Sequence, residues 1–282
     1  MNTKMIVTDM DGTLLDSKGR IPEENAAALL EAAQRGIEIV IATGRIYRNA
    51  RELCEAAGLR PHIISNNGAF IYTKDGERLH CLTLPENAVR DAAAWLDEHG
   101  YLYFANSDTE SLVPLGAAER ITAEFASSSS LLPGITAAAV EGLCGVIRNH
   151  SKPADLETIA RSNPGTITAI CADRPKLERG REHFRAHPSL TMTAGGNNLF
   201  EMNEPAASKG NAVGLLASRL GIPMSGVMAV GDHHNDLSMF DVAGTSVAMG
   251  NASDEIRKRC TRTTLTNDEC GLAHAVRSVL TA

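Results

Sequence analysis

The sequence predicts an α/β protein with a doubly wound parallel sheet and a second α/β unit inserted into it. Three observations predict this fold. Strand-like and helix-like segments alternate from residue 5 to residue 65, and the same alternation returns after residue 209. In both regions the apolar runs end directly in polar turns, which is typical of parallel strands joined by crossover helices. The stretch between them is less regular and contains no internal repeat.

The first elements follow from hydrophobic patterning. A strand is expected over Met5–Thr8, a short apolar run that ends in Asp-Met-Asp-Gly. Helices are expected over 22–35 and 46–57, because each segment has a helical pattern that ends at a glycine. The β-branched run 37–41 and the pair at 63–64 predict the next two strands.

The C-terminal region repeats this order. Helices are expected over 209–220, 236–243 and 272–280, and strands over 227–230 and 246–249. The two ends of the chain are therefore predicted to form halves of one doubly wound sheet.

Residues 84–190 are predicted to form the inserted unit, and 1–83 plus 191–282 the core domain. The predicted elements of the insert are helices over 85–99 and 156–161 and strands over 101–104 and 166–171. Four consecutive serines at 127–130, followed by Pro-Gly, indicate a surface loop.

Composition excludes several classes of protein. The chain has 282 residues, of which 43% are hydrophobic, and a net charge of −7. No run approaches the ~18 apolar residues of a membrane span, and the acidic residues Asp9 and Asp11 come too early for a signal peptide. The acidic balance and an aromatic content of 4% argue against nucleic acid. Six scattered cysteines without a C-x-x-C pair indicate reduced thiols in a cytoplasmic protein.

The first chemical motif begins at Asp9 and reads D-M-D-G-T-L-L. Its two carboxylates stand at the end of a predicted strand, where open α/β sheets bind ligands. Asp9 and Asp11 repel each other unless a cation or a shared proton compensates. The alternative is a polar turn, for which Gly12 is suited. A calcium loop fails on spacing, because Leu14 and Arg20 replace its glycine and its glutamate.

A second motif, G-D-H-H-N-D, follows the strand predicted over 227–230. It adds Asp232 and Asp236 to the carboxylates at the strand ends. Such a set of oxygen donors selects a hard divalent cation, and we predict Mg²⁺. His233 and His234 are adjacent in a loop, so their side chains point apart, and we interpret them as helpers or bystanders rather than zinc ligands.

Two further motifs supply groups for an anion. Thr43 offers a hydroxyl and Gly44 an unhindered N–H at a predicted helix start, although threonine is also a common helix cap. Lys209, in S-K-G, offers a point charge, although most lysines are solvated surface groups. The segment is not a P-loop, because Asn203 stands where the first glycine belongs.

In this order, D-x-D-G-T-L, T-G-R, S-K-G and G-D-x-x-N-D resemble the four motifs of the haloacid dehalogenase superfamily of phosphohydrolases. The insertion between the second and third motifs resembles the α/β cap of the Cof-type, or IIB, subfamily. Segments 65–69 and 247–252 resemble signatures of that subfamily. The resemblance implies a Rossmann-like core and a cap that sets substrate specificity.

The resemblance also implies roles for individual residues. Asp9 is implied as the nucleophile and Asp11 as the general acid, then base. Mg²⁺ would be held by Asp9, by the backbone carbonyl of Asp11 and by Asp232. Thr43 and Lys209 would hold the phosphoryl oxygens.

Four residues receive weaker assignments. Asn235 is expected to position Lys209 or the phosphoryl group. Asp236 is expected to hold the residues that bind the metal or the phosphate, without binding either itself. Arg45 and Asn67 are candidates for contacts with the substrate or the cap.

The predicted function is a Mg²⁺-dependent phosphatase for a small phosphorylated metabolite. A sugar or small polyol phosphate is favoured, because sparse aromatic residues provide no base-stacking signature. The alternatives are a phosphomutase of the same superfamily, a receiver domain that stores phosphate on an aspartate, and a non-catalytic phosphate-binding or regulatory protein. The D-x-D pair and the chain length favour turnover over storage.

Overall fold

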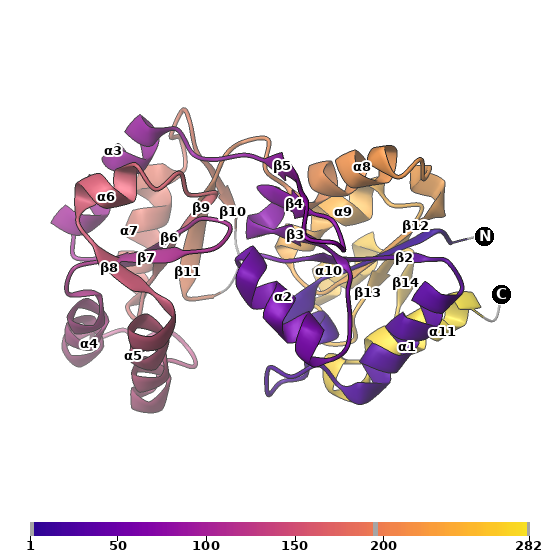
Figure 1. Cartoon of the computed structure of the whole chain (residues 1–282). Coiled ribbons are helices and arrows are strands. Elements are labelled where there is room, and N and C mark those ends of the chain that lie inside the picture. The colour runs from indigo at the N-terminus through magenta and orange to yellow at the C-terminus, as the bar shows by residue number, and fades with distance from the viewer. Residues whose placement is uncertain (1–2, 194–196, 281–282) are drawn as a thin grey trace. The chain divides into compact units, whose positions relative to one another are not determined.

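Residues 3–193 and 197–280 are described by a computed structural model of the chain (Figure 1). They form two units. The first contains the residues up to Cys81 and those from Ala206 onward, and the second spans Leu82–Pro205. The colours of Figure 1 show that both ends of the chain build the first unit and the middle builds the second.

The first unit contains an eight-stranded sheet in the order β14-β13-β12-β1-β2-β3-β4-β5. The strands from β14 to β3 are parallel, whereas β4 and β5 are antiparallel additions at one edge. Their bounds are β1 (Met5–Thr8), β2 (Glu38–Ala42), β3 (His62–Ser65), β4 (Phe70–Tyr72), β5 (Arg78–Cys81), β12 (Val227–Gly231), β13 (Thr245–Ala248) and β14 (Arg262–Thr263). The predicted doubly wound sheet is confirmed.

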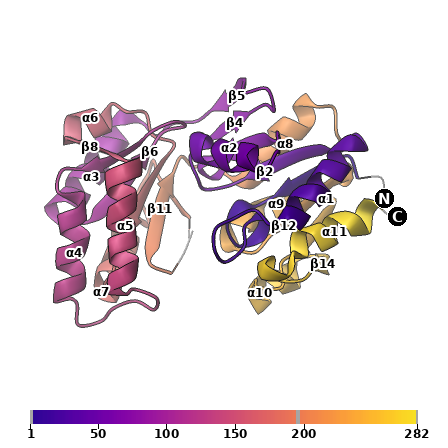
Figure 2. The same cartoon turned by 60° about the horizontal axis from the view of Figure 1, so that its bottom comes forward.

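Helices cover both faces of this sheet. They are α1 (Glu23–Gln34), α2 (Tyr47–Ala56), α8 (Lys209–Arg219), α9 (Leu237–Val242), α10 (Asp254–Arg259) and α11 (Gly271–Leu280). Ile6 of β1 packs in one apolar cluster with α1 and α11, which lie side by side in Figures 1 and 2. Met5 and Val7 pack in another cluster with α8 and α9. Because successive strand residues point to opposite faces, a wholly buried strand such as β1 requires this two-sided cover.

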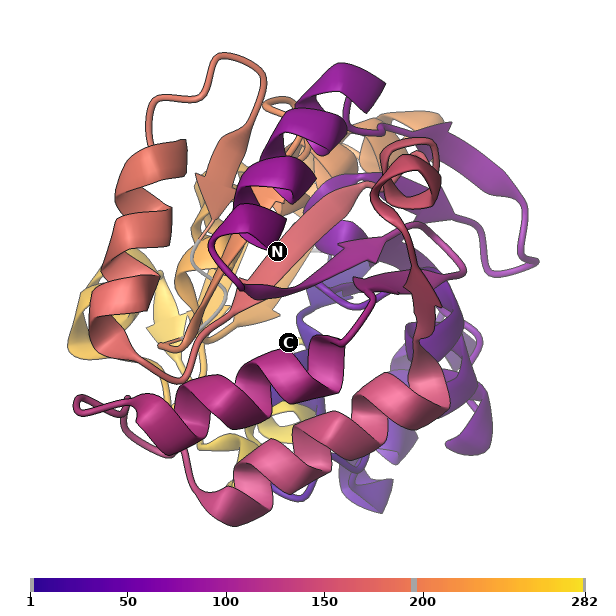
Figure 3. The same ribbon diagram turned by 90° about the vertical axis from the view of Figure 1, so that its left-hand side faces the viewer.

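The second unit contains a six-stranded sheet in the order β10-β11-β9-β6-β7-β8. Its strands are β6 (Leu102–Asn106), β7 (Ser111–Pro114), β8 (Lys152–Ala154), β9 (Thr166–Ile170), β10 (Thr191–Thr193) and β11 (Leu199–Asn203). Its helices are α3 (Glu86–Glu98), α4 (Ala117–Ser127), α5 (Ala137–His150), α6 (Leu156–Ala160) and α7 (Arg174–Phe184). The pair α4 and α5 lies side by side in Figure 3.

The boundary between the units differs from the expected position. Residues 191–205 belong to the second unit rather than to the core, because β11 pairs antiparallel with β9 and β10 pairs with β11. Phe200 and Met202 of β11 pack in the apolar core of that unit. The first boundary lies after Cys81. Among the described residues, no helix is long and apolar enough to span a bilayer.

Candidate active site

Four strand ends meet at one edge of the sheet of the first unit. β12, β1, β2 and β3 are parallel neighbours in this order, so their carboxyl ends lie together. Asp9 follows β1, Thr43 follows β2 and Asp232 follows β12. The Asp9 N–H donates to the Val230 carbonyl at 2.9 Å and the Thr43 N–H to the Ile64 carbonyl at 2.8 Å. The sheet therefore brings together motifs that are far apart in the sequence.

A buried ion-pair chain lies at the centre of this edge. The Lys209 Nζ donates to Asp9 Oδ1 at 2.5 Å and to Asp236 Oδ1 at 2.6 Å. Lys209 is the first residue of α8, and the preceding Ser208 caps this helix by accepting the Asn211 N–H. Asp9, Lys209 and Asp236 are 5%, 1% and 0% exposed. Lys209 is therefore part of the site and not a solvated surface group.

The negative charge of Asp9, Asp232 and Asp236 exceeds the positive charge of the one lysine among them. Burial raises the pKa of Asp9 well above its ordinary value, against the lowering effect of Lys209, and the charges of Asp236 and Asp232 raise it further. Burial, together with Asp236, raises the pKa of Asp232 to about 6. Burial opposes the charge of Lys209, but Asp236 and Asp9 overcome this effect and raise the pKa of the amine. One lysine thus leaves a deficit that a cation would remove.

Asp236 organises the loop that follows β12. Its Oδ2 accepts the backbone N–H groups of Asp232 and His233, both at 2.9 Å, while its Oδ1 accepts Lys209. Both carboxylate oxygens are therefore occupied by protein donors. Gly231 permits this approach, since a Cβ there would lie 2.5 Å from the Asp236 carboxyl carbon.

Asp232 packs against the turn that carries the D-x-D motif. Thr13 Oγ1 donates to Asp232 Oδ1 at 2.8 Å. Gly12 has φ +81°, and a Cβ at this position would lie 2.5 Å from Asp232 Oδ2. Glycine is thus required for both the backbone conformation and the close approach of the two loops.

The donor set of the site fits a hard cation. Asp9, Asp232 and Asp236 each place one carboxylate oxygen within 4.8 Å of the others. Asp236 is fully buried and accepts three protein donors, whereas Asp232 is only partly buried and Asp9 accepts Lys209 through one oxygen, so Asp9 and Asp232 are the carboxylates that could hold an ion. Carboxylate oxygens are ligands of hard cations such as Mg²⁺. The Asp11 carboxylate is not a member of this group, so its backbone carbonyl stays the predicted ligand.

Asp11 instead forms a bidentate ion pair with Arg45. The Arg45 Nε lies 2.8 Å from Asp11 Oδ2 and the Nη2 lies 2.6 Å from Oδ1. The Asp11 side chain is 57% exposed, in contrast to the buried Asp9. The hydrogen bonds to Asp11 raise the pKa of Arg45 above its ordinary value. Two residues that the sequence places in separate motifs are therefore paired with each other.

The T-G-R turn is braced by two asparagines. The Asn67 N–H donates to the Thr43 carbonyl at 3.0 Å, and Asn67 Oδ1 accepts Asn235 Nδ2 at 3.2 Å. A Cβ on Gly44 would lie 3.2 Å from Asn67 Oδ1. Asn67 has φ +56° and reaches this position from a left-handed turn. The Asn235 amide thus contacts Asn67, whereas the sequence predicts Lys209 or a phosphoryl group as its partner.

Two polar residues of the site receive no role from sequence reasoning. Thr13 binds Asp232 as described above, and Asn251 Nδ2 donates to the Gly12 carbonyl at 2.9 Å. The signal for both is present in the sequence, because Thr13 belongs to D-x-D-G-T-L and Asn251 to the segment 247–252. Their roles depend on contacts between distant loops, which motif spacing does not specify.

Known proteins are similar to this chain over nearly its whole length. A family model described as haloacid dehalogenase-like hydrolase matches residues 6–276. The phosphatase YwpJ of Bacillus subtilis (strain 168) is 33% identical, over 98% of this chain and 100% of its own length. The 5-amino-6-(5-phospho-D-ribitylamino)uracil phosphatase YwtE of the same organism is 31% identical, over 98% of each chain.

Solved structures show the same likeness. A haloacid dehalogenase-like hydrolase from B. subtilis has a TM-score of 0.83 at 32% identity, over 98% of this chain and 99% of the other. The HAD subclass IIB sugar phosphatase BT4131 has a TM-score of 0.78 at 22% identity, over 98% of both chains. The second likeness concerns the fold alone.

Proposed function

Because this chain belongs to the haloacid dehalogenase-like hydrolases and is a phosphoric monoester hydrolase, we propose that it hydrolyses small phosphorylated metabolites with the help of Mg²⁺. The observation that carries the proposal is the contact of Asp9 with Lys209 beside Asp232. This contact supports Asp9 as the nucleophile, Lys209 as the cation that binds phosphate and Asp232 as a second carboxylate for the metal.

Asp9 and Asp232, with the Asp11 carbonyl, would hold the ion. When bound, Mg²⁺ would neutralise part of the carboxylate charge and orient the phosphoryl oxygens. The raised pKa values of Asp9 and Asp232 support this assignment, since both carboxylates lack a sufficient counter-charge without it. Asp236 is assigned to positioning, because Lys209 and two backbone N–H groups occupy its oxygens.

In the first chemical step, a carboxylate oxygen of Asp9 attacks phosphorus and the bond from phosphorus to the leaving oxygen breaks. Asp11 donates a proton to that leaving oxygen. The Lys209 ammonium and the Thr43-Gly44 turn hold the transferring phosphoryl oxygens as charge moves onto them.

In the second step, water attacks the aspartyl-phosphate on Asp9. Asp11 takes one proton from this water, the bond between phosphorus and the Asp9 oxygen breaks, and inorganic phosphate leaves. Arg45 holds the Asp11 carboxylate through two hydrogen bonds, so Asp11 must exchange this partner for the substrate oxygen during turnover. Arg45 is therefore assigned to the positioning of Asp11.

We propose sugar or small polyol phosphates as the substrate class. YwtE, 31% identical, is named for a substrate with a 5-phospho-D-ribityl group, which is a phosphorylated polyol. The second unit, Leu82–Pro205, is proposed as the cap that selects among such substrates. This proposal rests on the resemblance of the inserted segment to the cap of the IIB subfamily.

Phosphate release tests this function. Purified protein should release inorganic phosphate from p-nitrophenyl phosphate and from a panel of sugar and polyol phosphates with Mg²⁺. Excess EDTA should abolish this release, and added Mg²⁺ should restore it. Release that EDTA leaves unchanged would overturn the metal assignment. Transfer of the phosphoryl group to a second sugar hydroxyl, without free phosphate, would show a mutase instead.

A further inference from the structure

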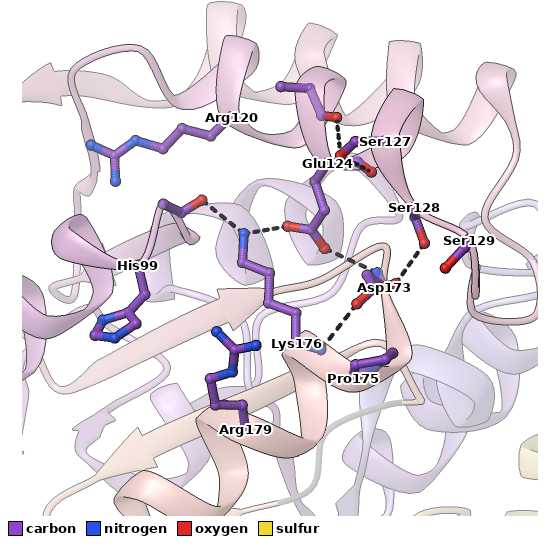
Figure 4. A pocket seen from close by; sticks show the side chains of 12 residues that line it. His99, Arg120, Glu124, Ser127, Ser128, Ser129, Asp173, Pro175, Lys176 and Arg179 are labelled. Carbon is purple, nitrogen blue, oxygen red and sulfur yellow. Dashed lines mark hydrogen bonds and ion pairs between the residues drawn. The ribbon is translucent and has the colours of Figure 1, made fainter.

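The second unit contains a pocket of about 620 Å³ whose lining includes none of the residues assigned to the phosphatase chemistry. All its lining residues belong to this unit and come from the end of α3, from α4 and the serines after it, and from α7 (Figure 4). Its volume falls within the roughly 300–1,000 Å³ of small-molecule sites. The charged and ionisable lining residues are His99, Arg120, Glu124, Asp173, Lys176 and Arg179.

Both carboxylates of the pocket are engaged by the protein. Glu124 is 8% exposed; its Oε1 accepts the N–H groups of Ala172 and Asp173, and its Oε2 accepts Lys176 Nζ at 2.6 Å. Asp173 accepts the Ser128 hydroxyl at 2.6 Å and the Lys176 N–H at 3.1 Å. Figure 4 shows this network on one side of the pocket. The carboxylates therefore link α4 to α7. The opposite side of the pocket is lined by cationic groups.

Arg179 is the lining cation that takes no part in this network. Arg120 is paired, since its Nη1 donates to Asp97 Oδ1 at 2.7 Å. Lys176 is paired with Glu124. Arg179 is exposed, and within residues 3–193 and 197–280 it has no hydrogen-bond or ion-pair partner. In Figure 4 its guanidinium extends toward the space between His99 and Lys176.

We propose that this pocket binds a small metabolite through an oxyanion group, phosphate or carboxylate, that Arg179 engages. A guanidinium presents paired N–H donors that match either group in a bidentate geometry. The Ser129 hydroxyl lies in the same lining and adds a neutral donor at its rim. The lining includes none of the residues that the proposed mechanism uses, so we propose the pocket as a second anion site.

The single tryptophan of the chain reports on this pocket. Trp95 stacks on His99, a lining residue, with ring centroids 4.2 Å apart and an interplanar angle of 23°. His183 stacks on Trp95 as well, at 4.1 Å and 8°. A ligand that contacts His99 changes the surroundings of the indole, so binding should alter the fluorescence of Trp95.

The test is a titration of the full chain in EDTA, where turnover is absent. Inorganic phosphate, glucose 6-phosphate and citrate are the probes, followed by Trp95 emission and by calorimetry. We expect saturable binding of at least one probe, and the comparison of citrate with the two phosphates decides which oxyanion is preferred. R179Q should weaken binding about tenfold or more, because a charged bidentate contact is lost.

The control is R185Q, which removes the same charge from the end of α7. Arg185 pairs with Glu182 and does not line the pocket, so this variant should bind like the wild type. R179Q should keep its turnover of p-nitrophenyl phosphate and its thermal midpoint. Absence of saturable binding for all three probes, or equal binding by R179Q and wild type, would overturn the proposal. A parallel loss of turnover in R179Q would overturn the separateness of the site.

Discussion

The Lys209 ammonium lies 2.5 Å from a carboxylate oxygen of Asp9, and both groups are almost fully removed from water. Asp236 contacts the same ammonium at 2.6 Å. A buried charge is tolerated only when it is paired, so these three groups depend on one another for stability. The same lysine that is proposed to bind the phosphoryl group therefore also stabilises the fold.

Lys209→Met should lower the free energy of unfolding by about 3–5 kcal/mol, because it leaves two buried carboxylates without their counter-charge. Urea denaturation in EDTA measures this change. Lys258→Met is the matched control, since Lys258 is exposed on α10, and it should change stability by less than about 0.5 kcal/mol. Equal stability of the two variants would contradict the charge balance described for the site.

Asp9→Asn should abolish phosphatase turnover and leave the fold intact. The amide is a poor nucleophile, but it has nearly the size of the carboxylate and removes a charge that Asp232 and Asp236 repel. Phosphate release and circular dichroism measure the two effects. Full activity of this variant would disprove the role of Asp9 as nucleophile.

Asp232→Asn should raise the Mg²⁺ concentration for half-maximal turnover by at least about tenfold, since even outer partners of metal ligands change affinity about 10–100-fold. Stability in EDTA should not fall, because the substitution removes a buried charge and an amide oxygen can still accept Thr13. A Mg²⁺ titration of the rate measures the first effect. An unchanged Mg²⁺ requirement would remove Asp232 from the metal site.

Asp11→Asn should slow the hydrolysis of alkyl phosphates more than the hydrolysis of p-nitrophenyl phosphate. An alkoxide leaving group needs the proton of Asp11, while p-nitrophenolate leaves without one, and general acid catalysis contributes about 10²–10⁴-fold. Single-turnover rates for a sugar phosphate and for the aryl phosphate measure this difference. Equal slowing of both substrates would assign Asp11 to the hydrolysis of the intermediate alone.

The parallel core was predictable because its strands are short apolar runs that end at polar turns. The second unit was less so. Helix α7 contains Gly180, which disfavours a helix in an isolated sequence. In the fold a Cβ at this position would lie 2.5 Å from the Phe200 ring, so the glycine permits the helix to pack against β11. Tertiary packing of this kind overrides the local preference that sequence patterns measure.

The residues of the candidate site were likewise only partly predictable from the sequence. Strand ends were sufficient to propose Asp9 and Asp232 as neighbours, because parallel strands bring their carboxyl ends to one edge. Lys209 opens a helix and was added to them by the order of the motifs. The pairing of Arg45 with Asp11 was not predictable, since it depends on the direction of two side chains across neighbouring loops. The sequence pattern indicates where the loops lie, whereas the direction of a side chain depends on the packing around it.

His62 should make the protein less stable in acid. Burial lowers its pKa from the ordinary 6.5, against the raising effect of Glu38, whose Oε2 lies 3.2 Å from His62 Nε2. Lys74 and Asp75 also influence this pKa. Because the unfolded histidine takes up its proton at higher pH, the contribution of His62 is complete above about pH 6.5 and is lost as the pH falls through the lower folded pKa. His62→Gln should therefore make the decline in unfolding free energy between pH 7 and pH 5 less steep. Urea denaturation in EDTA measures this decline. An unchanged decline would show that other groups cause the loss of stability in acid.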